Sequence, residues 1–141
     1  MDIGMIGVAA ALGLSAFGSA LGAGIAGMTA IGSWKKCFLQ NKPVPFLLVA
    51  FAGAPLTQTI YGFILMNAIR SGGLDGVGKL AVGLFAGLAM GASALYQGKA
   101  AAYASDALAE TGQGFGNYIL VVGLIETVAL FVMVFSLGIA G

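Results

Sequence analysis

Four long apolar stretches constrain the fold of this chain more than any other feature of its sequence. They cover residues 3–34, 43–69, 80–98 and 117–141, and the first three contain no charged side chain. Each is long enough to cross a membrane, because a spanning helix needs about 20 mainly apolar residues. Only 8% of the chain is charged, against about 25% in soluble domains. The sequence therefore predicts an all-α membrane protein with four transmembrane helices and no room for a soluble domain.

Composition and charge argue against several other classes. The N-terminus does not resemble a signal peptide, because Asp2 stands where a basic region is expected and the apolar run is too long. The net charge of +1 provides no basic patch for nucleic acid and no acidic tail. Cys37 is the only cysteine and the chain has no histidine, so neither an internal disulfide nor a transition-metal site is expected.

The charged residues between the stretches predict an orientation in the cell membrane. The third connection is expected to begin at Lys99 and to include Asp106 and Glu110. The Lys and Arg residues number four in the first and third connections and two in the second, namely Lys35, Lys36, Lys42 and Lys99 against Arg70 and Lys79. The positive-inside rule then places the connections after the first and third helices in the cytoplasm and both termini outside.

Short motifs recur in the two halves of the chain. Residues 19–21 (SAL) recur at 93–95, and residues 58–60 (QTI) align with residues 126–128 (ETV). An internal repeat of this kind changes the fold prediction. We expect a duplicated helical hairpin with parallel halves, residues 1–70 and 71–141, in which Gln58 occupies the position that Glu126 holds in the second copy.

Small residues at four-residue spacing mark the first and third predicted helices. Gly18 and Gly22 form a G-x-x-x-G pair, and Gly83, Gly87 and Gly91 repeat that spacing. In lipid such faces let helix backbones approach closely. The second and fourth helices are bulkier, so we predict a closed ring of identical subunits with the slender helices inside. The alternative is that the glycines only pack the four helices within one chain.

Glu126 is the one charged residue of the last apolar stretch. A carboxylate in hydrocarbon costs about 3 kcal/mol on insertion scales, and ionisable residues at such depth usually serve a function. At 1.5 Å per residue, Glu126 lies about 14 Å past Asn117 and Gln58 about 18 Å past Phe46, both near the middle of a core about 30 Å thick. We therefore predict that Glu126 binds an ion or a proton.

The second predicted helix carries polar residues at the same depth. Tyr61 lies four residues after Thr57 and three after Gln58, so the three share one helix face. Pro55 precedes them by half a turn. It removes a helix hydrogen bond and clashes with the carbonyl of Phe51, so kinked or loosened carbonyls are expected here.

Gln97 and Thr127 add polar groups from the third and fourth predicted helices. We expect Gln97 to lie toward the cytoplasmic side, because Lys99, two residues later, should extend to the interface. Hydroxyl, amide and carboxylate oxygens are the ligands of hard cations. One carboxylate balances one positive charge, so the set favours a monovalent cation over a divalent one. Interhelical hydrogen bonding alone is the alternative.

At these residues the sequence resembles the membrane-ring subunit of V-type ATPases, the duplicated-hairpin proteolipid called K or c, in particular its sodium-translocating bacterial form. The resemblance covers nearly the whole chain, and its most specific parts are residues 55–63 (PLTQTIYGF), 97–99 (QGK) and 126–127 (ET). It implies a rotor ring of identical subunits in the membrane lipid, whose outer helices carry the ion carboxylate. It also implies two kinds of partner: central-stalk subunits at the polar loops, and a stator subunit that supplies an arginine.

The resemblance implies a role for each polar residue. Glu126 is the essential ion-binding carboxylate, and Tyr61 hydrogen-bonds to it and closes the site. The remaining Na⁺ ligands are side-chain oxygens and one backbone carbonyl, from Thr57, Gln58, Gln97 and Ala54. The full polar set favours Na⁺ over H⁺ alone. The chain departs from the family at Leu56, where a glycine is expected. With no phosphate-binding loop, the chain is expected to be a non-catalytic subunit of an ATP-driven pump.

Three other interpretations of the sequence remain open. A proton-only rotor ring of the same family would use the same carboxylate. A small proton-coupled exporter also has four helices and one membrane carboxylate, but it typically carries the Glu in its first helix and lacks an internal duplication. A purely structural proteolipid would not need Thr57, Gln58 and Gln97.

Overall fold

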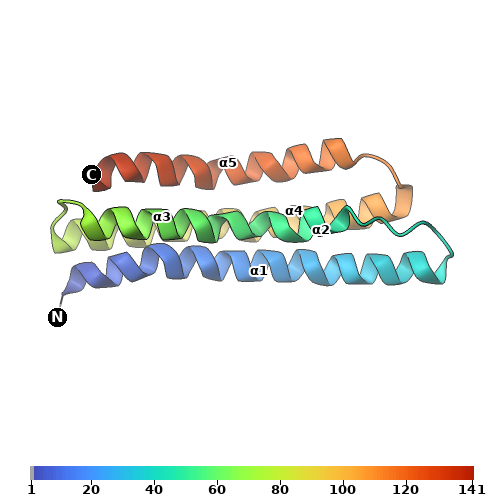
Figure 1. Ribbon diagram of the computed structural model, residues 1–141, viewed down its shortest axis with the longest axis horizontal. Helices are drawn as coiled ribbons and strands as arrows, with labels where there is room; N and C mark the ends of the chain where they lie inside the picture. The colour runs from blue at the N-terminus through green and yellow to red at the C-terminus, as the bar shows by residue number, and fades with distance from the viewer. Residues whose placement is uncertain (1) are drawn as a thin grey trace.

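The computed structural model describes residues 2–141 and consists of long helices that run side by side, with no strand among these residues (Figure 1). The elements in chain order are α1 (Ile3–Leu39), α2 (Leu48–Gly53), a short 3₁₀ helix η1 (Ala54–Leu56), α3 (Thr57–Ser71), α4 (Gly76–Thr111) and α5 (Phe115–Ala140). Because α2, η1 and α3 follow one another without a gap, the chain has four helical rods, each long and apolar enough to cross a membrane. The predicted all-α class with four spanning helices is confirmed.

Specific residues begin and end these helices. The carboxylate of Asp2 accepts a hydrogen bond from the Gly4 amide at 3.0 Å, and that of Asp75 accepts one from the Gly78 amide at 2.7 Å. Such N-terminal caps satisfy amides that have no partner within the helix. Gly112 ends α4 with φ of 68°, a left-handed conformation that glycine adopts without strain.

α4 extends beyond the point where the sequence predicted its end. We expected a connection that contained Lys99, Asp106 and Glu110, but all three lie within α4, which continues to Thr111. No residue between Gly98 and Gly112 breaks a helix, and the side chains of these charged residues are exposed on its surface. The first charged residue after the apolar stretch therefore did not mark the end of the helix.

The glycine faces pack α1 against α4. A Cβ atom built on Gly18 would clash with the Gly91 carbonyl, and one built on Gly22 would clash with the Ala94 carbonyl. A Cβ on Gly87 would lie 2.6 Å from the carbonyl oxygen of Ala10. Because these glycines are used within one chain, as the alternative interpretation held, their spacing by itself does not require a ring.

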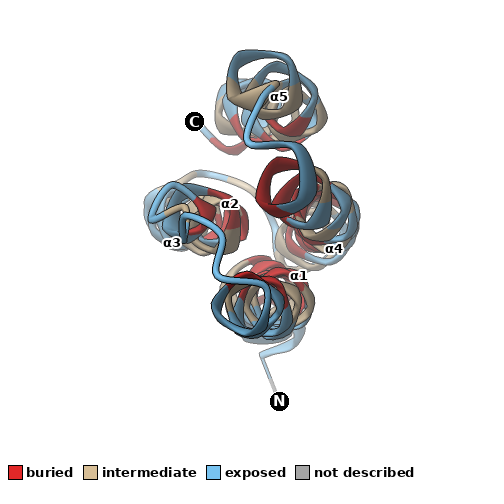
Figure 2. Ribbon diagram, turned by 90° about the vertical axis from the view of Figure 1, so that its right-hand side faces the viewer, coloured by how far each residue is buried: buried red, intermediate tan, exposed pale blue. Residues whose placement is uncertain are grey.

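Viewed end-on, the helices form a layered arrangement (Figure 2). α1 packs on α4 and on the α2–α3 rod, and α5 contacts α4 and α3 on the side away from α1. Buried residues line the surfaces that face one another, while the outward faces carry exposed apolar side chains such as Phe17, Phe85 and Phe135. The exposed apolar faces suit a surrounding of lipid or of other copies of the chain.

Candidate ion-binding site

The second rod is interrupted at Pro55, as the sequence predicted. Pro55 has no amide hydrogen to give to the carbonyl of Phe51, and the α-helix tightens there into η1 before it resumes at Thr57. The side-chain hydroxyl of Thr57 lies 3.1 Å from the carbonyl oxygen of Ala54 and hydrogen-bonds to it. The interruption thus brings a backbone oxygen and a side-chain oxygen together on one side of the rod.

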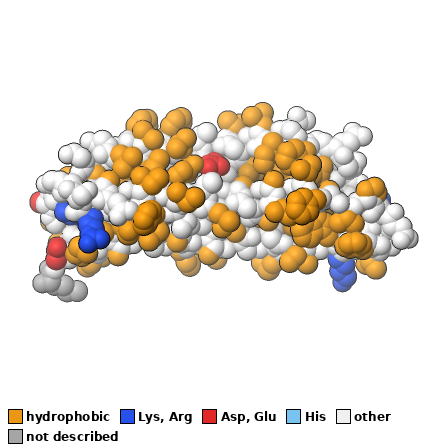
Figure 3. All heavy atoms as spheres, viewed as in Figure 1, with side chains coloured by type: hydrophobic (Ala, Val, Ile, Leu, Met, Phe, Trp, Pro, Cys, Tyr) orange, Lys and Arg blue, Asp and Glu red, His pale blue; other side chains and the backbone are white. Residues whose placement is uncertain are grey.

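Glu126 lies on α5, partly buried against two other helices. Tyr61 of α3 donates a hydrogen bond from its hydroxyl to Oε1 of Glu126 at 2.8 Å. Gln97 of α4 donates from Nε2 to Oε2 at 3.1 Å. Each carboxylate oxygen therefore has a donor. In Figure 3 an acidic side chain lies near the middle of the long axis among hydrophobic ones, while basic side chains lie toward the two ends.

A chain of hydrogen bonds continues from Gln97 to the interrupted rod. The Nε2 amide of Gln97 also donates to the carbonyl of Val122 at 3.1 Å, and its Oε1 accepts from Nε2 of Gln58 at 2.7 Å. On the other side of Gln58, Oε1 lies 3.2 Å from the hydroxyl of Thr57. Both glutamine side chains are completely buried.

Three oxygens gather at the end of this chain: the Ala54 carbonyl, the Thr57 hydroxyl and Oε1 of Gln58. The Thr57 hydroxyl lies within 3.2 Å of both others. A hydroxyl has one hydrogen to donate, and carbonyl oxygens have none. Among these three groups the Thr57 hydroxyl is therefore the one side-chain donor. An oxygen-rich cluster that is linked to a carboxylate through Gln58 and Gln97 has the kind of ligand that hard cations prefer.

The structure unites all six residues predicted for the site. Glu126, Tyr61, Gln97, Gln58, Thr57 and Ala54 form one connected network. Gln97, which we expected toward the cytoplasmic side, contacts the carboxylate of Glu126 and also the carbonyl of Val122, one helical turn earlier in α5.

Two nearby residues stay outside the network. The hydroxyl of Thr127 donates to the Leu124 carbonyl of its own helix at 2.6 Å. The side chain of Leu56, where the family resemblance implies a glycine, is 53% exposed. Leu56 therefore does not fill the space beside the site residues.

Ser93 of α4 belongs to the network, although no role was predicted for it from the sequence. Its hydroxyl donates to the Ile125 carbonyl at 2.9 Å and accepts a longer hydrogen bond of 3.5 Å from Nε2 of Gln58. The sequence did contain a signal, because Ser93 lies one helical turn before Gln97 and so shares its face.

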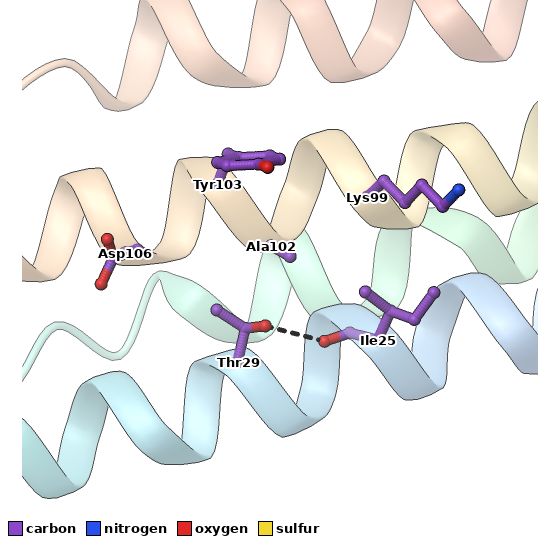
Figure 4. Close-up of a pocket in the computed structure, with 6 residues that line it drawn as sticks. All are labelled: Ile25, Thr29, Lys99, Ala102, Tyr103 and Asp106. Carbon is purple, nitrogen blue, oxygen red and sulfur yellow. Dashed lines mark hydrogen bonds between the residues drawn. The ribbon is translucent and has the colours of Figure 1, made fainter.

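A separate groove lies between α1 and α4 (Figure 4). It has a volume of about 590 Å³ and is lined by Ile25, Thr29, Lys99, Ala102, Tyr103 and Asp106. The ammonium of Lys99 also lies 4.8 Å from the centre of the Tyr96 ring. None of the residues that line the groove takes part in the Glu126 network, so the two features are distinct.

Comparisons with known proteins agree with this architecture. Residues 80–139 match the model of a protein family described as the C subunit of ATP synthase. The chain is also similar to the A-type ATP synthase subunit K of Methanocaldococcus jannaschii, with 34% identity over 132 residues. That alignment covers 92% of this chain and 57% of the relative. The chain therefore spans little more than half the length of this relative, while the alignment includes both of its own hairpins.

Proposed function

We infer that this chain, whose residues 80–139 match the family of ATP synthase C subunits, is a rotor-ring subunit of a rotary A- or V-type ATPase. Four spanning helices and the similarity to a subunit K over both hairpins support this function. The subunit is not itself catalytic. It carries an ion through the membrane, while ATP is hydrolysed or made in a separate soluble part of the complex.

The transported ion is Na⁺ in this proposal, bound by Glu126 together with oxygens of Thr57, Gln58, Gln97 and Ala54. The observation that carries the proposal is the cluster of oxygens from Ala54, Thr57 and Gln58, in which the Thr57 hydroxyl is the one side-chain donor. Binding and release of a proton requires only the carboxyl group and a hydrogen-bond partner. A proton-only rotor would not require this oxygen cluster, whose role would then be limited to hydrogen bonds within and between the helices.

The charge of Glu126 explains how such a site can work during rotation. An ionised carboxylate that faces lipid is costly, whereas a carboxylate that is neutralised by Na⁺ or H⁺ is much less so. A positively charged arginine on a neighbouring stator subunit would stabilise the free carboxylate and so favour release of the ion. Tyr61 donates to one oxygen of Glu126 and Gln97 to the other, and these two hydrogen bonds hold the carboxylate in place while the ion is absent.

The proposed partners are identical subunits in a ring, the stator subunit, and central-stalk subunits at the loops that follow α1 and α4. We propose that these two loops are cytoplasmic and that both termini are outside. The support is charge: Lys35, Lys36 and Lys42 lie at the first connection, against Arg70 and Lys79 at the second. Since Lys99 lies well inside α4, it no longer contributes to this comparison.

Two measurements on the detergent-purified protein test these proposals separately. Native mass spectrometry should find an assembly many times the 14.0 kDa subunit mass. A dimer would instead favour the small proton-coupled exporter. Binding of ²²Na⁺ should saturate at one ion per subunit and should be lost in Glu126→Gln. A ring that binds no Na⁺ would retain the rotor function and leave H⁺ as the transported ion.

A further inference from the structure

Ser93 lies between α5, the helix that carries Glu126, and the side chain of Gln58 on α3. It lies on α4, one turn before Gln97, and is 6% exposed. Ser93 and Gln97 each donate a hydrogen bond to a backbone carbonyl of α5, at Ile125 and Val122 respectively. These two carbonyls belong to the turn that leads to Glu126. These two hydrogen bonds therefore hold α5 against α4 in the helical turn just before Glu126.

The hydrogen of the Ser93 hydroxyl is committed to the Ile125 carbonyl at 2.9 Å. A serine hydroxyl has one hydrogen, so toward Gln58 it can only accept. The amide nitrogen of Gln58 faces two acceptors, Oγ of Ser93 at 3.5 Å and Oε1 of Gln97 at 2.7 Å. If the Gln58 amide turned over, its oxygen would face two acceptors instead. Such an arrangement leaves buried polar groups without partners and is unfavourable.

Gln97 and Ser93, which both accept hydrogen bonds from Gln58, are held in place by different contacts. Gln97 presents its oxygen to Gln58 because its own amide donates to Val122 and to the carboxylate of Glu126. Its orientation is therefore tied in part to the position of the Glu126 carboxylate. Ser93 donates to a backbone carbonyl of α5, so its own orientation does not depend on a contact with that carboxylate.

From this geometry we propose that Ser93 is a positioning residue of the ion site, which keeps Oε1 of Gln58 turned toward the hydroxyl of Thr57. Ser93 does not touch the cation in this assignment and acts through Gln58. The proposal rests on the proposed ion-binding function, because it assigns Oε1 of Gln58 to the cation.

The first copy of the repeat supplies a matched control. Ser19 is the counterpart of Ser93 in the duplicated motif and is 2% exposed, yet its hydroxyl has no hydrogen-bond partner in the structure. Ser19→Ala therefore removes a buried hydroxyl without removing a hydrogen bond. Ser93→Ala removes the same group at a position where it makes two hydrogen bonds.

The first measurement is the side-chain amide signal of Gln58, by NMR of glutamine-labelled protein in lipid. The chain has glutamines at positions 40, 58, 97 and 113, and Gln58→Leu assigns the signal by its disappearance. The parent and Ser19→Ala should give one Gln58 signal. In Ser93→Ala the signal should broaden or double.

The second measurement is the dissociation constant for ²²Na⁺. Loss of one neutral hydrogen bond that orients a ligand should weaken Na⁺ binding about two- to tenfold in Ser93→Ala. Ser19→Ala should bind like the parent. An unchanged Gln58 signal or an unchanged Na⁺ affinity in Ser93→Ala overturns the proposal. If the parent binds no Na⁺, the sodium function fails instead, and the NMR comparison alone decides whether Ser93 orients Gln58.

Discussion

The hydroxyl of Tyr61 lies 2.8 Å from Oε1 of Glu126 and donates a hydrogen bond to it. This contact joins α3, from the first half of the chain, to α5, from the second. The two hairpins therefore contribute to one network, in which the second half supplies the carboxylate and the first supplies the tyrosine and the oxygen cluster.

Tyr61→Phe should weaken Na⁺ binding by roughly tenfold or more. The substitution keeps the ring but removes a hydrogen bond to a charged group, and such a bond contributes about 1.5–3 kcal/mol. The carboxylate of Glu126 would then lose one of its two donors. Tyr103→Phe is the matched control, because Tyr103 is 82% exposed and lies outside the network. Titration of ²²Na⁺ into the purified proteins measures the effect, and equal affinities would contradict the role of Tyr61.

Gln58→Leu and Gln97→Leu should each reduce Na⁺ affinity about 10- to 150-fold. Each variant removes a polar group from a buried cluster, where an unmade contact to a charge costs about 1.5–3 kcal/mol. Glu126 remains able to take a proton in both variants, so carbodiimide labelling should persist. Gln113→Leu, at an exposed position after α4, is the control. Parent-like Na⁺ binding by both buried variants would show that the coordination set is wrong.

Carbodiimide should label Glu126 more readily than the other carboxyl groups, because the reagent attacks protonated carboxyls in apolar surroundings. Asp2, Asp75, Asp106 and Glu110 are all exposed. If Na⁺ and H⁺ compete for one carboxylate, Na⁺ should slow the labelling and its apparent affinity should fall as the pH is lowered.

Potassium serves as the control ion in the same experiment. As a larger cation it should protect Glu126 much less, if the oxygens form a fitted cage. Peptide mass spectrometry of the labelled protein gives the rate at each pH. Labelling that ignores Na⁺ at every pH would leave a proton-only rotor as the better description.

Gly18→Ala should destabilise the subunit by about 1–3 kcal/mol, the usual cost of an overpacked interface. The added methyl would meet the Gly91 backbone of α4, which cannot move aside as a flexible side chain could. Gly24→Ala is the control, because a Cβ on Gly24 has no atom within 4 Å in the subunit. Thermal unfolding in detergent compares the two. A melting temperature that falls equally in both would contradict the close contact between α1 and α4.

The sequence predicted most of the fold because membrane-spanning helices leave a strong signal. The four rods and the interruption at Pro55 are confirmed. The end of α4 was missed because hydropathy reports whether a segment is apolar, while the helix itself continues until Gly112 breaks it. Hydropathy and helix ends coincide only when a helix stops at the membrane surface, and α4 carries exposed charges along its last turns.

The residues of the candidate site could be predicted from the sequence, but the hydrogen bonds between them could not. Glu126 was conspicuous as a lone charge, and Tyr61, Thr57 and Gln58 followed from helical spacing. The partners of Gln97 depend on how α4 and α5 pack, which spacing within one helix does not determine. Ser93 shares a helix face with Gln97, but its main partner is a backbone carbonyl of α5, and such a contact cannot be identified from the sequence.

The contact between Gly18 and Gly91 also has a mechanical consequence. With no side chains between them, the backbones of α1 and α4 touch directly, so little can yield when one helix is pushed sideways against the other. The two helices should therefore bend and twist together as one rigid unit. If the subunit turns against a resisting force, α1 and α4 would transmit torque along their length with little elastic deformation. Because α5 packs mainly on α4, Glu126 would keep a fixed distance from this pair of helices.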